Sequence, residues 1–304
     1  MTSMQRYCVE NYEDYFVIGS EAYEDSLEEK IENLRDKLIG KYRKVTIKSG
    51  DILEVEIYPL GANKGGKRGR KKQESRTVQA NLNNKNAVKY LIRLLNTNFT
   101  DKDLTLTLTY SNEHLPANPE QAKKDMENYL RRIKRSMKKE QPGEKLKYVY
   151  VTEYEYDEEK GKKRIHHHLV MNFRNREIAK EKWNGRGRVS AEELEPNHFG
   201  LEGLARYLAK DKKNKNKNGT KSYTPSRNLK KPTITIADSK VTRRRVEKLA
   251  TGELEAQDYF EKLYKGYQFN DMEVKYSDFV NGAYLYVRMK RIDNPVQTKR
   301  RLNV

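Results

Sequence analysis

The chain has 304 residues, and its 63 lysines and arginines outnumber its 44 aspartates and glutamates, which gives a formal net charge of +19. This balance favours a polyanionic partner such as nucleic acid, and the single cysteine, Cys8, excludes an intrachain disulfide or thiolate metal cluster and is typical of a reducing compartment. No apolar run approaches the ~20 residues that span a bilayer and residues 1–10 lack the pattern of a signal peptide, so we expect a cytoplasmic protein without a membrane partner.

The first predicted segment, residues 1–60, is an N-terminal helix-plus-hairpin accessory module. Apolar residues at helical spacing predict a helix over residues 20–40, and two apolar runs around Ser49–Asp51 predict a pair of short strands. The module has 8 basic and 13 acidic side chains, so the positive charge lies in the rest of the chain. Residues 61–76 are rich in Gly, Lys and Arg without apolar periodicity, which predicts a basic flexible linker.

The linker contains Gly61, Gly66 and Lys67 at the spacing of a phosphate-binding loop. Arg68 stands where a Ser or Thr would bind magnesium, and the sequence that follows has no helical pattern. We therefore predict no nucleotide cofactor and no fused ATP-driven helicase.

Helical and alternating patterns then follow one another. Apolar residues predict a helix around Val88–Leu95, and Leu104–Tyr110 alternates at period two, as in a strand with one buried face. Asn118 as N-cap and Pro119 in the first turn predict an amphipathic helix that ends near Lys139. Residues 146–156 and 164–173 read as a β-hairpin.

Beyond Trp183, the glycine-rich run Asn184–Arg188 predicts a loop, and leucines at 201, 204 and 208 predict a short helix followed by a Lys/Asn-rich segment, Lys212–Asn218. The remaining predicted elements are a strand over 232–236, helices over 241–250 and 253–264, and a strand over 282–288. This order predicts an α+β protein with a central antiparallel sheet and flanking helices.

Three of the five histidines are consecutive, His166, His167 and His168, inside the predicted hairpin. Alternate side chains of a strand share a face, so His166 and His168 project together while His167 faces the apolar side. Two imidazoles one pleat apart can chelate a divalent metal, although a polar patch on an exposed strand is the alternative.

Glu153 and Glu155 lie on one face of the preceding strand. In one register Glu153 faces His168 and Glu155 faces His166, whereas a shift by one residue puts both glutamates behind the histidines. Two imidazoles with a carboxylate suit Mn²⁺ or Mg²⁺ with open positions for phosphate oxygens.

Tyr207 and Lys210 are three residues apart in the predicted helix and therefore neighbours on one face. With 21 tyrosines in the chain, such a pair has little weight without the histidines. Residues 205–231 carry 10 basic residues and one acid, which favours binding of a nucleic-acid strand, although a solvated loop is the alternative. The candidate DNA-binding residues are Arg206, Lys212, Lys213, Lys221, Arg227, Lys230 and Lys231.

The run His166–His168 followed by Tyr207 and Lys210 resembles the HUH endonucleases that initiate rolling-circle replication of plasmids and phages. His167 departs from that pattern, because a bulky hydrophobic residue usually stands there. The resemblance covers roughly residues 76–290 and extends to three further segments, Leu104–Tyr110, Thr152–Tyr154 and Ser226–Pro232.

The resemblance implies an HUH/RRM-like palm over residues 77–231 and a C-terminal strand/helix extension, 232–304, that packs on this core. It implies that Tyr207 is the nucleophile assisted by Lys210, and that the metal ligands are His166, His168 and Glu153, with Glu155 as the runner-up to Glu153. The residues four positions from Tyr207 are Gly203 and Asp211, so the chain resembles the single-tyrosine class.

The function implied is a metal-dependent nickase and strand transferase that cuts and rejoins single-stranded or hairpin origin DNA through a 5′-phosphotyrosine. A host helicase and polymerase are the expected partners. The alternatives are a conjugative relaxase or transposase with the same chemistry, and a non-catalytic nucleic-acid-binding module in which the histidines are idle.

Overall fold

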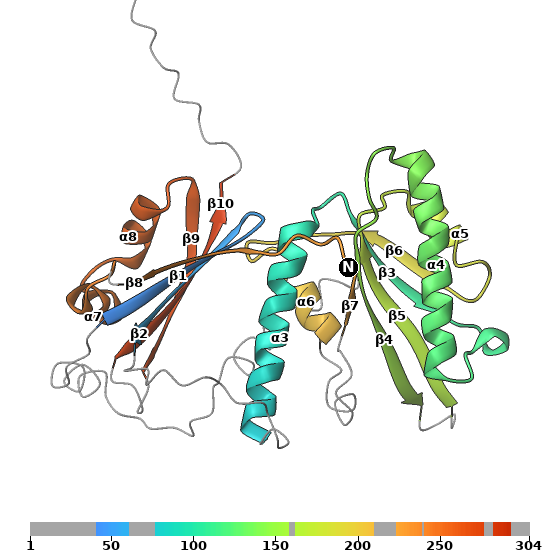
Figure 1. Ribbon diagram of the computed structural model, residues 1–304, viewed down its shortest axis with the longest axis horizontal. Coiled ribbons are helices and arrows are strands. Elements are labelled where there is room, and N and C mark those ends of the chain that lie inside the picture. Colours follow the sequence, from blue (N-terminus) through green and yellow to red (C-terminus); the bar gives the residue numbers. More distant parts are fainter. Residues whose placement is uncertain are drawn as a thin grey trace, which may run out of the picture. The chain divides into compact units, whose positions relative to one another are not determined.

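The computed structural model describes residues 41–60, 77–157, 162–209, 223–238, 240–276 and 282–292, and only the backbone of 41, 60, 77–84, 154–157 and 162–164. Within these residues there are six α-helices and ten strands. The strands form two antiparallel five-stranded sheets (Figure 1), so the predicted α+β class is confirmed. The predicted helix over 20–40, the linker over 61–76 and the segment Lys212–Asn218 lie outside the described residues.

The chain forms two compact units, each described separately below. In the described part of the chain, unit 1 contains Ala87–Asn197 and Leu201–Lys231, and unit 2 contains the residues from 41 to Asn86, His198–Gly200 and the residues from Pro232 onward. None of the helices in the described ranges is long and apolar enough to cross a membrane.

The sheet of unit 1 has the strand order β6-β3-β5-β4-β7, with every neighbouring pair antiparallel. The predicted strand and hairpin are its three central strands, and the leucines of the first are buried at alternate positions as expected for period two. The strands are β3 (Leu104–Thr109), β4 (Tyr148–Asp157), β5 (Lys162–Met171), β6 (Val189–Glu193) and β7 (Thr224–Pro225).

Helices cover both faces of this sheet (Figure 1). On one face, α4 (Pro119–Glu140) and α5 (Arg176–Glu181) pack on the leucines of β3. On the other, α3 (Thr77–Asn98), from Ala87 onward, and α6 (Glu202–Ala209) pack on the valines of β4 and β5. A short 3-10 helix, Asn112–His114, follows β3.

The start of α4 forms as its sequence predicts. The Asn118 side chain accepts a hydrogen bond of 2.8 Å from the backbone N–H of Gln121, and Pro119 occupies the first turn, where its missing N–H has no helical partner to lose. The Gln121 side chain donates to Asp125, one turn further along the helix, instead of closing a capping box.

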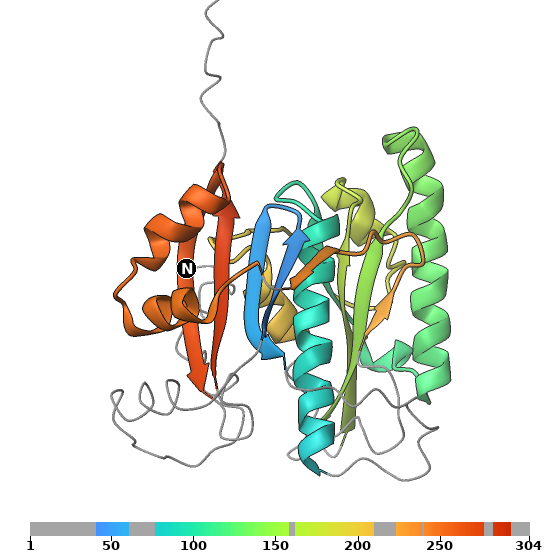
Figure 2. The same ribbon diagram turned by 60° about the vertical axis from the view of Figure 1, so that its left-hand side comes forward.

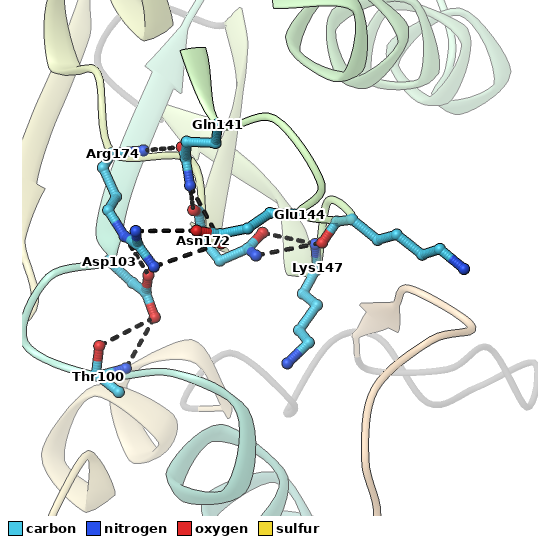
Figure 3. Close-up of polar contacts among 8 residues, drawn as sticks. Thr100, Asp103, Gln141, Glu144, Lys147, Asn172 and Arg174 are labelled. Atoms are coloured by element: carbon cyan, nitrogen blue, oxygen red, sulfur yellow. Dashed lines mark hydrogen bonds and ion pairs between the residues drawn. The ribbon is translucent and has the colours of Figure 1, made fainter. Parts of the chain in front are cut away.

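A polar network connects the end of α4 with the start of β3 and the end of β5 (Figure 3). The Asp103 carboxylate accepts from the Thr100 N–H at 2.9 Å and lies 3.8 Å from the Arg174 guanidinium, which also pairs with Glu144. Burial raises the pKa of Asp103, although the Thr100 hydrogen bond and the charge of Arg174 oppose the shift. Gln141 completes the network, because it receives the Arg174 N–H and donates to the Asn172 carbonyl.

The sheet of unit 2 has the order β8-β1-β2-β10-β9, and α7 (Arg243–Thr251) and α8 (Ala256–Leu263) cover one of its faces (Figure 2). The predicted N-terminal hairpin therefore pairs with strands from the C-terminal segment on both sides. The domain boundaries predicted after residues 60, 76 and 231 stay a prediction. The strands are β1 (Lys41–Ser49), β2 (Ile52–Leu60), β8 (Thr233–Asp238), β9 (Tyr267–Tyr276) and β10 (Ala283–Arg291).

Candidate metal and tyrosine site

The hairpin of β4 and β5 brings Glu153, His166 and His168 together on the sheet face that α3 and α6 cover. The ligand atoms of the three side chains lie within 4.8 Å of one another. Glu153 Oε2 is 3.0 Å from His166 Nε2 and 3.6 Å from His168 Nε2. Within the described residues, this is the one group of three or more His, Cys, Asp or Glu side chains with metal-binding geometry.

The register explains this convergence. Glu153 pairs with His166 and not with His168, so the register differs by two residues from the one that sets Glu153 opposite His168. Because side chains alternate with a period of two, this difference keeps the glutamate on the same face as His166 and His168. Glu155 pairs with Arg164 in the backbone register, one step further from the histidines, and its side chain lies outside the described residues.

The electrostatics of the group favour a cation. Burial alone would raise the pKa of Glu153, but the hydrogen bond from His166 and the proximity of the His168 ring, whose Nε2 lies 3.6 Å away, hold it well below its usual range. Glu153 is therefore ionised at neutral pH, and the side chains are mostly shielded from solvent, at 15% exposure for Glu153 and 18% for His166. Two imidazole nitrogens and a carboxylate oxygen fit a divalent metal ion with further positions open.

Thr107, which sequence reasoning missed, orients one of the histidines. Its hydroxyl lies 3.1 Å from Nδ1 of His168, its partner in the β3–β5 register, which leaves Nε2 directed at Glu153. A second partner on the far ring nitrogen is the usual means by which a metal-binding histidine is fixed. The alternating Leu-Thr pattern shows that the threonines share a face, but not that this face carries the histidines.

His167 occupies the opposite face as predicted, and its polar ring is accommodated by two hydroxyl groups. Tyr110 lies 2.9 Å from its Nε2 and Thr152 2.9 Å from its Nδ1, while the Trp183 ring packs edge-on at 5.9 Å. Burial, with the charges of His166 and His168, lowers the pKa of His167 to about 3, so the ring is neutral. A neutral imidazole donates through one nitrogen and accepts through the other, and both hydroxyls can serve either role.

Tyr207 reaches the site from α6. Leu201, Ala205 and Leu208 anchor the helix in the apolar cluster that it shares with α3, β4 and β5. The backbone N–H of Leu201 donates to the Asn96 side chain at 2.7 Å, which fixes the entry to the helix. The Tyr207 hydroxyl lies 3.3 Å from His168 Nε2. The structure thus brings the predicted nucleophile and the predicted ligands together, while Lys210 lies outside the described residues.

The predicted DNA-binding residues fall into three groups. Arg206 pairs with Glu202 one turn earlier in α6, at 2.8 Å. Arg227, Lys230 and Lys231 are exposed on a segment that is held to the unit by hydrogen bonds between Asn98 and the Lys230 backbone. Lys212, Lys213 and Lys221 lie outside the described residues.

The fold and the site define an α+β protein with a candidate His-His-Glu metal centre and an adjacent tyrosine. Residues 103–215 match the family of Replication-associated protein ORF2, and this range contains the three candidate ligands and Tyr207. The match supports a Rep-type replication initiator. Neither the curated proteins nor the solved structures give a match to the chain.

Proposed function

We propose that this protein is a single-tyrosine HUH endonuclease that initiates rolling-circle replication by nicking and rejoining single-stranded DNA. The observation that carries the proposal is the position of the Tyr207 hydroxyl, 3.3 Å from a nitrogen of the Glu153–His166–His168 group. A nucleophile beside a candidate metal centre is a geometry suited to metal-assisted phosphoryl transfer. The family match over residues 103–215 supports a role in replication.

The reaction exchanges one phosphoester for another. The Tyr207 oxygen attacks the scissile phosphorus, and the bond from phosphorus to the 3′-oxygen breaks. The tyrosine hydroxyl loses a proton in this step, and the leaving 3′-oxygen gains one. The products are a 3′-hydroxyl and a 5′-phosphotyrosine, which retains the bond energy for rejoining. Attack by a 3′-hydroxyl on the phosphotyrosine reverses these bond changes, so no nucleotide cofactor is needed.

Glu153, His166 and His168 would hold the metal ion, for which we propose Mn²⁺ or Mg²⁺. When bound, such an ion polarises the phosphate oxygens and stabilises the charge of the transition state. Thr107 keeps His168 oriented, and the helix α6 keeps Tyr207 at the centre. We propose that Lys210 adds positive charge beside the tyrosine.

The proposed substrate is single-stranded or hairpin DNA at a replication origin. The 3′-hydroxyl suits extension by a host polymerase, and a host helicase would supply the unwound strand. Conjugative relaxases and transposases share this chemistry, and the family match favours replication among the three. The residues proposed to grip the strand are Arg206, Lys212, Lys213, Lys221, Arg227, Lys230 and Lys231.

Formation of a covalent adduct tests the proposal. The full chain is incubated with single-stranded origin DNA, labelled at its 3′ end, with and without Mn²⁺, and the mixture is separated under denaturing conditions. We expect a labelled protein band only with the metal, and none from Tyr207→Phe. Tyr223→Phe is the matched control, because Tyr223 packs against the same apolar cluster as Tyr207.

An adduct in Tyr207→Phe would assign the nucleophile to another tyrosine. Metal-independent binding of the DNA by the wild type, without any adduct, would favour a non-catalytic nucleic-acid-binding module.

A further inference from the structure

We infer that Arg188 is a DNA-contact residue. It binds a backbone phosphate of the DNA strand that lies on the same face of the sheet as the metal centre. The inference rests on the proposed function, since it takes the bound DNA to lie on that face.

The position of Arg188 follows from the strand register. Thr109 pairs with His166, and the Thr109 N–H donates to the Arg188 carbonyl at 3.0 Å, which continues the β3–β6 register by one pair beyond β6. Opposite residues of an antiparallel pair project to the same face. Glu153, His166, Thr109 and Arg188 therefore form one row across four neighbouring chain segments, and Arg188 lies two strand spacings, roughly 10 Å, from His166.

This side of the sheet is accessible to a ligand. The helices α3 and α6 pack on β4 and β5, whereas Thr107 and Thr109 of β3 are partly exposed and Arg188 and Ser190 are exposed. On the same face of β6, the acidic side chain is Glu192, which receives a hydrogen bond from Ser190 and lies four residue pairs along the ladder from Arg188.

Arg188 is exposed and takes part in none of the ion pairs among the described residues, in contrast to Arg186 and Arg176. Arg186 pairs with the buried carboxylate of Asp125 at 2.9 Å, and Arg176, on the opposite face, pairs with Glu193 at 3.4 Å. A planar guanidinium matches two phosphate oxygens at once, so an exposed arginine in the row of a phosphodiester-cleaving centre is suited to hold the substrate backbone.

The backbone that carries Arg188 is fixed. Its N–H donates to the Thr109 hydroxyl at 3.1 Å, and the Ser111 N–H donates to the Arg186 carbonyl at 2.7 Å. Between them, Gly187 packs so closely on Thr109 that a β-carbon there would lie 2.2 Å from the Thr109 carbonyl oxygen. A fixed backbone lowers the loss of conformational entropy on binding.

Equilibrium binding of a labelled single-stranded oligothymidylate, about 20 nucleotides long to cover one binding site, tests this inference in the full chain with Tyr207→Phe to prevent cleavage. In fluorescence anisotropy with Mn²⁺, we expect Arg188→Gln to weaken binding about tenfold or more, as for a lost charged hydrogen bond. The slope of log affinity against log salt should fall by about 0.7, the value for one phosphate contact. Arg188→Lys should keep most of the salt slope because it keeps the charge.

Arg176→Gln is the matched control, since it removes the same charge from the other face of the same sheet. We expect it to change affinity less than twofold. Equal losses in Arg176→Gln and Arg188→Gln, or none in either, would overturn the inference. Tryptophan emission from the buried Trp183, close to this loop, shows whether each variant is folded.

The adduct assay separates this inference from the proposed function. Normal binding by Arg188→Gln, with a metal-dependent adduct in the wild type, would refute the role of Arg188 and leave the nickase proposal intact. Weaker binding by Arg188→Gln, with no adduct in the wild type, would support the DNA contact and overturn the nicking activity alone.

Discussion

Replacement of Gly187 by alanine should destabilise unit 1 through a clash that no side-chain rotation relieves. The added methyl carbon would lie 2.2 Å from the Thr109 carbonyl oxygen and 2.7 Å from its carbon, whereas ordinary contacts begin at 3.4 Å. Both atoms belong to the backbone, so the loop must move by about 1 Å. Overpacking of this kind costs about 1–3 kcal/mol, and the loss of one backbone hydrogen bond adds about 1 kcal/mol.

The expected total is a decrease of about 2–4 kcal/mol in the free energy of unfolding. Urea titration followed by tryptophan fluorescence measures it, because Trp183 is the single tryptophan of the chain and its indole N–H donates to the Thr109 carbonyl at 2.7 Å. The midpoint should fall without a change in the slope of the transition.

Gly203→Ala is the control, with an effect of opposite sign. Gly203 lies in α6, and a β-carbon there meets nothing within 4 Å. Alanine should stabilise the helix by about 0.5–1 kcal/mol. If Gly187→Ala and the wild type unfold at the same urea concentration, the close packing on Thr109 does not constrain the loop, and the fixed position inferred for Arg188 loses its support.

Three further outcomes are expected, all measured by the same fluorescence titration. Mn²⁺ at about a hundred times its dissociation constant should raise the free energy of unfolding by about 2.7 kcal/mol, and Glu153→Gln should greatly reduce this gain; an unchanged gain would place the metal elsewhere. His167→Leu should cost about 1–3 kcal/mol because it removes the hydrogen bonds between the ring and the Tyr110 and Thr152 hydroxyls, and adding Thr152→Val should recover part of the loss. Asp103→Asn should be more stable than the wild type at pH 7, because the native state disfavours the ionised carboxylate of Asp103. The difference in the free energy of unfolding between the two should shrink as the pH falls through the raised pKa of Asp103 toward its unfolded value. A difference that grows would contradict burial as the cause of the shift.

Local patterns predicted the elements that form the centre of unit 1. The alternation in Leu104–Thr109, the N-cap at Asn118 and the strand-like runs of the β4–β5 hairpin each depend on neighbouring residues alone, and each element is present. The two-residue side-chain period also placed His166 and His168 on one face and His167 on the other, as the contacts of their rings show.

Elements with mixed faces were not predicted from the sequence. The strand β9, Tyr267–Tyr276, lies at a sheet edge, and most of its residues are partly exposed without clean alternation. The short strand β6, Val189–Glu193, gives too few residues to establish a period. Thr107 and Arg188 were missed for another reason, because their positions depend on pairing between β3 and strands about 60 to 85 residues later in the chain.

The strand order of unit 2 has a consequence for protein synthesis. Its central strand β2 pairs with β1, its neighbour in sequence, but also with β10, which ends at Arg291. At the usual ribosomal rate, about 10 to 50 seconds separate the emergence of these two partners. All strands of the β6-β3-β5-β4-β7 sheet are made within this interval, so the site can assemble while the edge of β2 still waits for its second neighbour.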